Sequence, residues 1–205
     1  MREKRVSTFR RRWQAKRRSL NFNKRRKKAD FKWIPKVLLT IIETALIIFA
    51  AYAVVFFFGD CIFAIGDSMS PEIEEEDPLL LNKFDYIFRN PRAGDVVAFK
   101  IGGRKEASVS VKRIIGVPGD SVFINGGKVF VNGEIYEESE SIPVISDPGR
   151  AMDEITLKDN EYFVLGDNRN HSTDSRFTSV GNVSGDYLLG RVWFNLKKDR
   201  IGLVE

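Results

Sequence analysis

Cysteine and histidine are almost absent from this chain of 205 residues, which contains one cysteine, Cys61, and one histidine, His171. A single cysteine excludes a disulfide within the chain, so the fold depends on a packed core. With one residue of each kind, a zinc site built from Cys and His ligands is not expected. We expect no metal and no cofactor. Any histidine base for nucleophilic catalysis has to be His171 itself.

Acidic residues are scarce in the first 36 positions, which hold sixteen Lys or Arg and only two acids. The remaining residues carry 17 basic and 26 acidic side chains, so the net charge of +5 comes from the N-terminal segment alone. A basic segment can bind nucleic acid, bind anionic lipid, or only orient a neighbouring membrane helix. The segment that follows favours the membrane, and we expect no nucleic-acid partner.

Charge is almost missing from Val37–Phe58, a run of 22 residues (VLLTIIETALIIFAAYAVVFFF) whose only charged side chain is Glu43. As a helix, this run spans about 30 Å, the thickness of a bilayer's hydrocarbon core. It is longer than the apolar region of a signal peptide, about 7–15 residues, and more uniformly apolar than a soluble core helix. We predict a transmembrane helix at 36–58, a basic cytoplasmic tail at 1–35 that contacts membrane lipid, and an extracytoplasmic domain at 59–205.

Helical periodicity is missing beyond residue 58, where β-branched and aromatic residues gather in short runs between turn signals. These runs predict strands at 95–101, 108–115, 121–131, 161–165 and 187–194. Asn125-Gly126 divides the third run into a hairpin, because both residues adopt positive φ readily. The polar stretch 137–158 predicts an irregular surface segment. The fold class is therefore mainly β, with antiparallel sheets preceded by one transmembrane helix.

A candidate nucleophile, Ser68, follows the apolar run by ten residues in GDSMSP (66–71). A serine hydroxyl attacks only when a base removes its proton. His171 is one candidate base, although a histidine in such a polar loop is commonly solvated. Lys112 is the other, because burial among its small and apolar neighbours would lower its pKa and leave the amine neutral. A solvent-facing lysine paired with an acid is the alternative, and the residues by themselves leave the base open.

Four segments, taken in order, resemble one known family. They are GDSMSP (66–71), AGDVVAFK (93–100), VKRIIGVPGD (111–120) and GDNRNHSTDSR (166–176). Behind an N-terminal apolar helix, this set resembles the bacterial type I signal peptidases over about residues 37–196, and the fourth segment is the most specific. The resemblance implies antiparallel sheets of the signal-peptidase type. It also implies a membrane-anchored serine endopeptidase that removes signal peptides from exported preproteins.

The resemblance further implies a Ser-Lys dyad. Ser68 would attack the scissile carbonyl and form an acyl-enzyme, with Lys112 as the base. The backbone N–H of Ser68 would donate to the oxyanion. Some relatives add a hydroxyl two residues before the nucleophile, where this chain has Gly66. Further departures from the family pattern, which concern the substrate pocket more than the chemistry, are Glu72, Ser110 and His171.

Supporting roles are implied for four more residues. Ser172 would orient the Lys112 amine through a hydrogen bond. Asp174 and Arg176 would form an ion pair behind the site, for which an ordinary surface pair is the alternative. Met69 would pack beside the nucleophile.

The implied substrates are preprotein signal peptides with small residues at the first and third positions before the cut. The ten residues from Phe58 to Ser68 reach at most about 33–36 Å, so the nucleophile stays near the outer membrane surface. Two other functions fit part of the pattern. A self-cleaving Ser-Lys peptidase of the repressor type would carry a DNA-binding domain in place of the anchor, and a membrane-tethered binding protein would keep the fold without catalysis.

Overall fold

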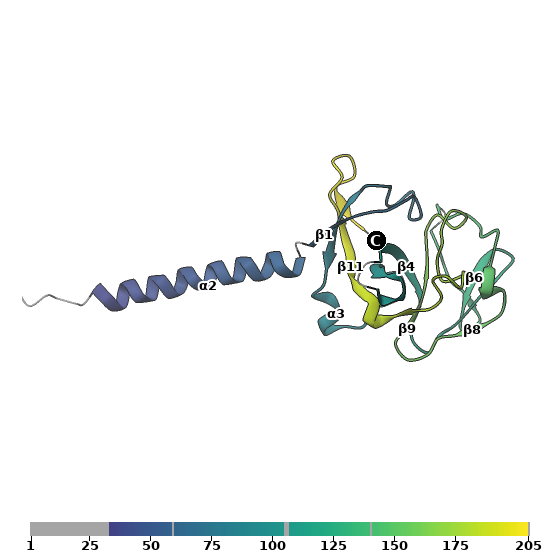
Figure 1. Ribbon diagram of the computed structural model, residues 1–205, viewed down its shortest axis with the longest axis horizontal. Coiled ribbons are helices and arrows are strands. Elements are labelled where there is room, and N and C mark those ends of the chain that lie inside the picture. The colour runs from purple at the N-terminus through teal and green to yellow at the C-terminus, as the bar shows by residue number, and fades with distance from the viewer. Residues whose placement is uncertain (1–32, 59, 105–106, 140, 205) are drawn as a thin grey trace, which may run out of the picture. The chain divides into compact units, whose positions relative to one another are not determined.

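A computed structural model of the chain describes residues 33–58, 60–104, 107–139 and 141–204 (Figure 1). The chain divides into two compact units, Met1–Leu46 and Ile47–Glu205. The predicted cytoplasmic tail at 1–35 falls almost entirely outside the described residues.

The apolar run forms one helix, α2 (Ile34–Phe58), of 25 residues. Pro35 lies in its first turn, where a missing N–H breaks no hydrogen bond because the first four N–H groups have no partner within the helix. The hydroxyls of Thr40 and Thr44 donate to carbonyls one turn earlier, so these polar groups are satisfied inside the helix. Residues Ile34–Phe56 are long and apolar enough to cross a membrane, with a mean hydropathy of 2.3, and the helix is not buried in a core.

The larger of two sheets has eight strands, all paired antiparallel, in the order β1-β2-β11-β3-β4-β9-β10, with β12 paired to β11. Its strands are β1 (Asp60–Phe63), β2 (Pro78–Asn82), β3 (Val96–Lys100), β4 (Val109–Gly116), β9 (Glu161–Leu165), β10 (Val183–Ser184), β11 (Leu188–Asn195) and β12 (Gly202–Leu203). The mainly β, antiparallel fold class predicted from the sequence is confirmed.

The smaller sheet has four strands in the order β7-β6-β5-β8 and lies beside the larger one, where β6 and β8 are labelled (Figure 1). Its strands are β5 (Ser121–Asn125), β6 (Lys128–Val131), β7 (Glu134–Ile135) and β8 (Ile155–Thr156). Gly126 and Gly127 connect β5 to β6 with φ of 57° and 76°. Positive φ at both central residues is the requirement of a type I′ two-residue turn, so the predicted hairpin is confirmed. Its turn is Gly126-Gly127 rather than the predicted Asn125-Gly126, because Asn125 pairs with Lys128 as the last residue of β5.

The stretch 137–158 differs from the surface segment that its polarity predicted. It contains β8 and a short helix, η3 (Gly149–Met152), and it buries Ile145, Ala151 and Leu157. These apolar residues are too widely spaced to produce a period, yet each anchors the stretch to the smaller sheet. The remaining short helices are α3 (Asp85–Phe88), η2 (Ile101–Gly103) and η4 (Gly185–Tyr187).

Three groups of buried apolar side chains form the core. The first holds Met69 and Ile73, which follow Ser68 in the chain, against the larger sheet. The second lies between the smaller sheet and β9, and the third covers the other face of β9. Their β9 members alternate along the strand, with Phe163 and Leu165 in the second group and Tyr162 and Val164 in the third. Strand β9 is therefore buried on both faces, and the motif 166–176 starts where it ends.

Strand β4 is paired differently along its two halves. On one side, β3 pairs with Val109–Arg113. On the other side, β9 pairs only with Arg113–Gly116, with a register shift between Ile114 and Gly116. Among the described strands, none pairs with the edge of Val109–Lys112 that faces away from β3. The first half of β4 is therefore an open edge.

Candidate active site

Ser68 and Lys112 come together from distant parts of the chain. Ser68 lies in the loop between β1 and β2, and Lys112 lies in β4. The Lys112 Nζ and Ser68 Oγ atoms are 2.6 Å apart. Nζ also donates to the Val111 carbonyl at 3.0 Å. The separation of amine and hydroxyl suits direct proton transfer between them.

The surroundings of Lys112 favour a neutral amine. Lys112 is only 6% exposed, and this burial lowers its pKa because an ammonium ion loses its hydration. The carboxylates of Asp174 and Asp167 raise the pKa, but by less than burial lowers it. Each carboxylate is itself paired with an arginine, Asp174 with Arg176 and Asp167 with Arg113. The amine therefore loses its proton at a lower pH than a lysine in water.

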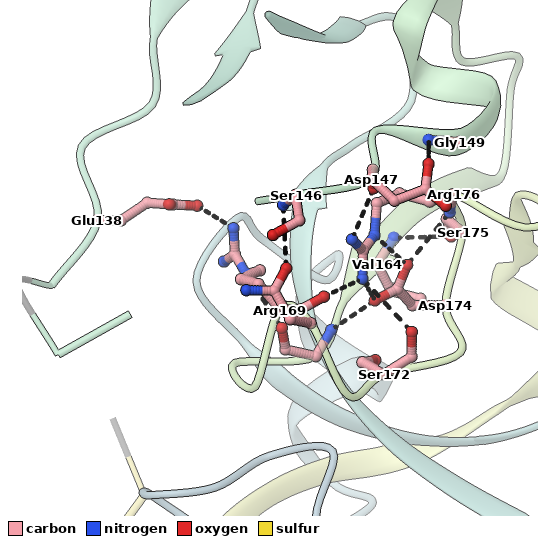
Figure 2. Close-up of polar contacts among 12 residues, drawn as sticks. Glu138, Ser146, Asp147, Gly149, Val164, Arg169, Ser172, Asp174, Ser175 and Arg176 are labelled. Atoms are coloured by element: carbon pink, nitrogen blue, oxygen red, sulfur yellow. Dashed lines mark hydrogen bonds and ion pairs between the residues drawn. The ribbon is translucent and has the colours of Figure 1, made fainter. Parts of the chain in front are cut away.

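Asp174 and Arg176 form a two-pronged ion pair (Figure 2), with Nε 2.9 Å from Oδ1 and Nη2 3.0 Å from Oδ2. Both side chains are buried, at 0% and 2% exposed. The Asp174 carboxylate also accepts the Gly166 N–H at 3.1 Å, and Arg176 donates to the Arg169 carbonyl at 2.6 Å. The pair therefore lies inside the fold, and it ties the beginning and middle of the motif 166–176 to its end.

Ser172 is buried but does not make the contact expected of it. Its Oγ has no hydrogen-bond partner among the described residues, and the second hydrogen bond of the Lys112 amine goes to Val111 instead. Gly166 brings Ser172 close to the nucleophile. A Cβ on Gly166 would lie 2.3 Å from Ser172 Oγ and 2.4 Å from the Ser68 carbonyl oxygen. Only glycine fits between the two serines.

Met69 follows Ser68 and is 2% exposed. Its side chain lies in the first core group, and its carbonyl accepts the Ile73 N–H at 2.9 Å. Met69 therefore anchors the turn that starts at Ser68.

Three contact residues were not assigned from the sequence. Arg113 lies on the face of β4 opposite the Lys112 amine, and its guanidinium binds Asp167 at 2.8 and 2.7 Å. Asn168 donates its backbone N–H to the Ser68 carbonyl at 3.1 Å and its side-chain amide to the Asp67 carbonyl at 3.2 Å. These residues belong to the recognised motifs, but a motif does not state which of its side chains touch.

A cleft of about 310 Å³ opens beside the loop between β1 and β2, which carries Ser68 and is called the nucleophile loop below. Pro71 and Glu72 line it from that loop, and Tyr136 and Glu138 line it from the segment after β7. This volume lies at the lower end of the range for ligand pockets, about 300–1,000 Å³. Within the described ranges, no group of three or more His, Cys, Asp or Glu side chains is arranged to hold a metal ion.

Comparison with known proteins gives a consistent result over most of the chain. The family model for signal peptidase, peptidase S26, matches residues 36–196. A probable signal peptidase I-2 from Synechocystis sp. is 33% identical over 153 residues, covering 72% of this chain and 68% of that protein. Signal peptidase I P from Bacillus subtilis subsp. natto is 32% identical over 163 residues, covering 75% and 82%. A solved signal peptidase I from Enterococcus faecalis V583 is 25% identical, covers 51% of this chain and 97% of its own, and has a TM-score of 0.39.

Proposed function

Because this chain belongs to the signal peptidase family, peptidase S26, we propose that Ser68 and Lys112 form the catalytic dyad of a membrane-anchored endopeptidase. The chain is a serine peptidase that cleaves signal peptides. One observation carries the assignment of the dyad: a buried amine, with its pKa lowered by burial, lies 2.6 Å from a serine hydroxyl.

In the first half of the reaction, neutral Lys112 removes the proton from Ser68 as Oγ attacks the carbonyl carbon of the scissile peptide bond. The negative charge that develops on the substrate oxygen is met by the Ser68 N–H. When the C–N bond breaks, Lys112 returns the proton to the leaving nitrogen. The mature protein departs with a new amino terminus, and the signal peptide stays attached to Ser68 as an ester.

In the second half, Lys112 accepts a proton from water while the water oxygen attacks the ester carbon. Collapse of this intermediate breaks the bond to Ser68 Oγ, and Lys112 returns the proton to the serine. The amine is neutral again at the end of the cycle. The balance of protons closes without any group other than the dyad and water.

The supporting residues act on the geometry of the dyad. Asp174 and Arg176 hold the motif 166–176 in place behind the site, and Met69 anchors the nucleophile loop. Ser172, buried and without another partner among the described residues, is the hydroxyl available to accept a hydrogen bond from Lys112 once Ser68 is acylated.

The open edge of Val109–Lys112 supports a binding mode for the segment before the cut. An extended peptide that adds to this edge forms main-chain hydrogen bonds with any sequence. It would present its carbonyl to Ser68, because Lys112 is the last residue of the open half. Specificity would then come from pockets that admit only small side chains, as the family's substrates imply.

We further propose that α2 spans the cell membrane once, with the basic tail at 1–35 in the cytoplasm against anionic lipid and the catalytic domain at 59–205 outside. The concentration of Lys and Arg before the helix supports this orientation. A preprotein held by its own apolar segment would meet the enzyme on the same membrane surface.

The test is cleavage of a preprotein by the full chain in detergent or vesicles. We expect Ser68→Ala and Lys112→Ala to abolish cleavage while thermal unfolding remains cooperative. Ser121→Ala and Lys128→Ala are matched controls, because these residues lie in β5 and β6 of the smaller sheet. They should cleave at the wild-type rate.

Cleavage by either dyad variant at the wild-type rate would exclude the dyad. A folded wild-type chain that leaves preproteins intact would instead favour a binding protein, and cleavage restricted to its own chain would favour the self-cleaving class.

A further inference from the structure

The nucleophile loop and the motif 166–176 meet at one residue, Asn168. Its backbone N–H donates to the Ser68 carbonyl at 3.1 Å, and its Nδ2 donates to the Asp67 carbonyl at 3.2 Å. The two carbonyls belong to successive peptide groups, one on each side of the Ser68 α-carbon. Asn168 therefore holds both peptide planes that flank the nucleophile, one through its backbone and one through its side chain.

The contact to Asp67 also sets the direction of the Ser68 N–H. The Asp67 carbonyl and the Ser68 N–H belong to the same planar trans peptide group, in which they point in opposite directions. Two donors hold the carbonyl end of this group, Asn168 Nδ2 and the Ser70 N–H at 3.0 Å. At the other end, the Ser68 N–H makes no hydrogen bond to any residue in the described ranges. An N–H held in this way is prearranged to receive the oxyanion.

The oxygen of the Asn168 amide faces His171. The His171 Nδ1 lies 3.3 Å from Asn168 Oδ1, and the His171 backbone N–H donates to the Asn168 carbonyl at 3.0 Å. In the tautomer with the proton on Nδ1, His171 donates to the amide oxygen, and the Nδ2 end of the amide is left for Asp67. His171, which the sequence offered as a candidate base, contacts Asn168 and no dyad atom.

Gly66 makes the Ser68 N–H more important for stabilising the oxyanion. A glycine at this position has no side chain and hence no hydroxyl to offer the oxyanion. Backbone donors must then supply more of the stabilisation, and their direction matters more.

We propose that Asn168 is a positioning residue for catalysis: its side-chain amide holds the Asp67–Ser68 peptide so that the Ser68 N–H faces the developing oxyanion. This inference rests on the proposed function. Asn168 binds the Ser68 and Asp67 carbonyls rather than Ser68 Oγ or Lys112 Nζ, so it acts through the peptide group. Loss of a whole oxyanion donor lowers kcat by about 10²–10³-fold. Because the Ser70 N–H still holds the Asp67 carbonyl, we expect a smaller fall in kcat, of about tenfold.

The experiment compares Asn168→Ala and Asn168→Asp with wild type in the full chain. The aspartate keeps the size of the side chain but replaces the amide donor by a carboxylate, so it tests the hydrogen bond if the alanine variant folds poorly. Asn170→Ala is the matched control, because Asn170 has the same side chain in the same motif but contacts only Ser146 and Val144. Each protein is assayed for kcat, KM, the pH profile of kcat, and inhibition by a peptide aldehyde.

A peptide aldehyde reports on the oxyanion site directly, because addition of Ser68 Oγ to its carbonyl gives a tetrahedral adduct that resembles the transition state. In both Asn168 variants we expect kcat to fall about tenfold at unchanged KM, and the affinity for the aldehyde to weaken by the same factor. The acid limb of the pH profile should stay in place in Asn168→Ala, since the Lys112 contacts are untouched; Asn168→Asp adds a carboxylate beside Asp167 and is compared on kcat and aldehyde binding alone. The Asn170→Ala control should match wild type.

Wild-type kcat in both Asn168 variants would overturn the proposal. It would also be overturned if kcat fell without weaker aldehyde binding, or if the acid limb moved in Asn168→Ala, because either result places the damage elsewhere in the site. Absence of cleavage by the wild-type chain itself would instead be a failure of the proposed function, and the two failures are thus distinguishable.

Discussion

Replacing Gly166 with alanine should slow the peptidase strongly although Ser68 and Lys112, the proposed dyad, are both retained. The new Cβ would lie 2.3 Å from Ser172 Oγ and 2.4 Å from the Ser68 carbonyl oxygen. The Ser172 hydroxyl can rotate away, although the Ser172 Cβ would still lie 2.6 Å from the new Cβ. The Ser68 oxygen belongs to the backbone, so the whole nucleophile segment has to move.

The size of this movement gives the size of the effect. Ordinary Cβ contacts begin at 3.4 Å, so the Ser68 carbonyl must retreat by about 1 Å. A displacement of about 1 Å between reacting groups can lower the rate by about 10²-fold. The same shift stretches the 2.6 Å separation between Lys112 Nζ and Ser68 Oγ. We therefore expect kcat to fall about a hundredfold.

The assay is preprotein cleavage with kcat and KM measured separately, alongside thermal unfolding to show that the variant is folded. Gly202→Ala is the matched control, because its new Cβ would meet nothing closer than 3.9 Å. A double variant, Gly166→Ala with Ser172→Ala, removes the clash with Ser172 Oγ but keeps those with the Ser172 Cβ and the Ser68 carbonyl oxygen. It should remain impaired, since the clash with the Ser68 carbonyl persists.

Wild-type kcat in Gly166→Ala would refute this reasoning, because it would mean that the nucleophile tolerates a displaced carbonyl. Full recovery in the double variant would also refute it, since the damage would then come from Ser172 alone.

Two further predictions concern charge. Arg176→Gln leaves the buried Asp174 carboxylate without its ion-pair partner, and we expect a loss of stability of about 3–5 kcal/mol. The unneutralised carboxylate should also raise the pKa of Lys112, so the acid limb of the kcat profile moves to higher pH. An unmoved limb would contradict this. Lys112→Met should abolish cleavage yet raise stability at neutral pH. Burial holds the pKa of Lys112 in the folded state below its ordinary 10.5. As pH falls from 10.5 to this lower pKa, the unfolded chain takes up the proton first, so the free energy of unfolding decreases by about 1.4 kcal/mol for each pH unit between the two values. Denaturant unfolding that shows no gain for Lys112→Met would contradict the burial argument.

Much of the fold was predictable because its central strands carry a strong local signal. The runs at 108–115 and 161–165 consist largely of β-branched and aromatic residues, and they form β4 and β9 within one residue of the predicted bounds. Strands β1, β2, β8, β10 and β12 were not predicted. The last three have two residues each, and their pairing is decided by tertiary neighbours rather than by their own side chains. Strands β1 and β2 are also short, at four and five residues.

The candidate site was predictable as a set of residues but not as a set of contacts. The motifs contain Ser68 and Lys112, yet only the path of the loop after β1 brings their side chains together. Ser172 shows that a place in a motif does not determine a contact, since the hydrogen bond predicted for it is not formed in this structure. Asn168 lies 101 residues from Asp67, and no period or spacing relates two such positions. Long-range contacts depend on how the sheets pack, which local sequence does not encode.

Strand β9 connects the packing of the smaller sheet to the geometry of the site. One face of the strand belongs to the core beneath that sheet, and the residue after its last position is Gly166. We expect any loosening of the smaller sheet to displace β9, and with it the motif 166–176 beside Ser68. Unfolding of the smaller sheet would therefore lower activity even while Ser68 and Lys112 remain in the larger sheet and its loop. Heat inactivation of the enzyme should follow the unfolding of whichever sheet is less stable.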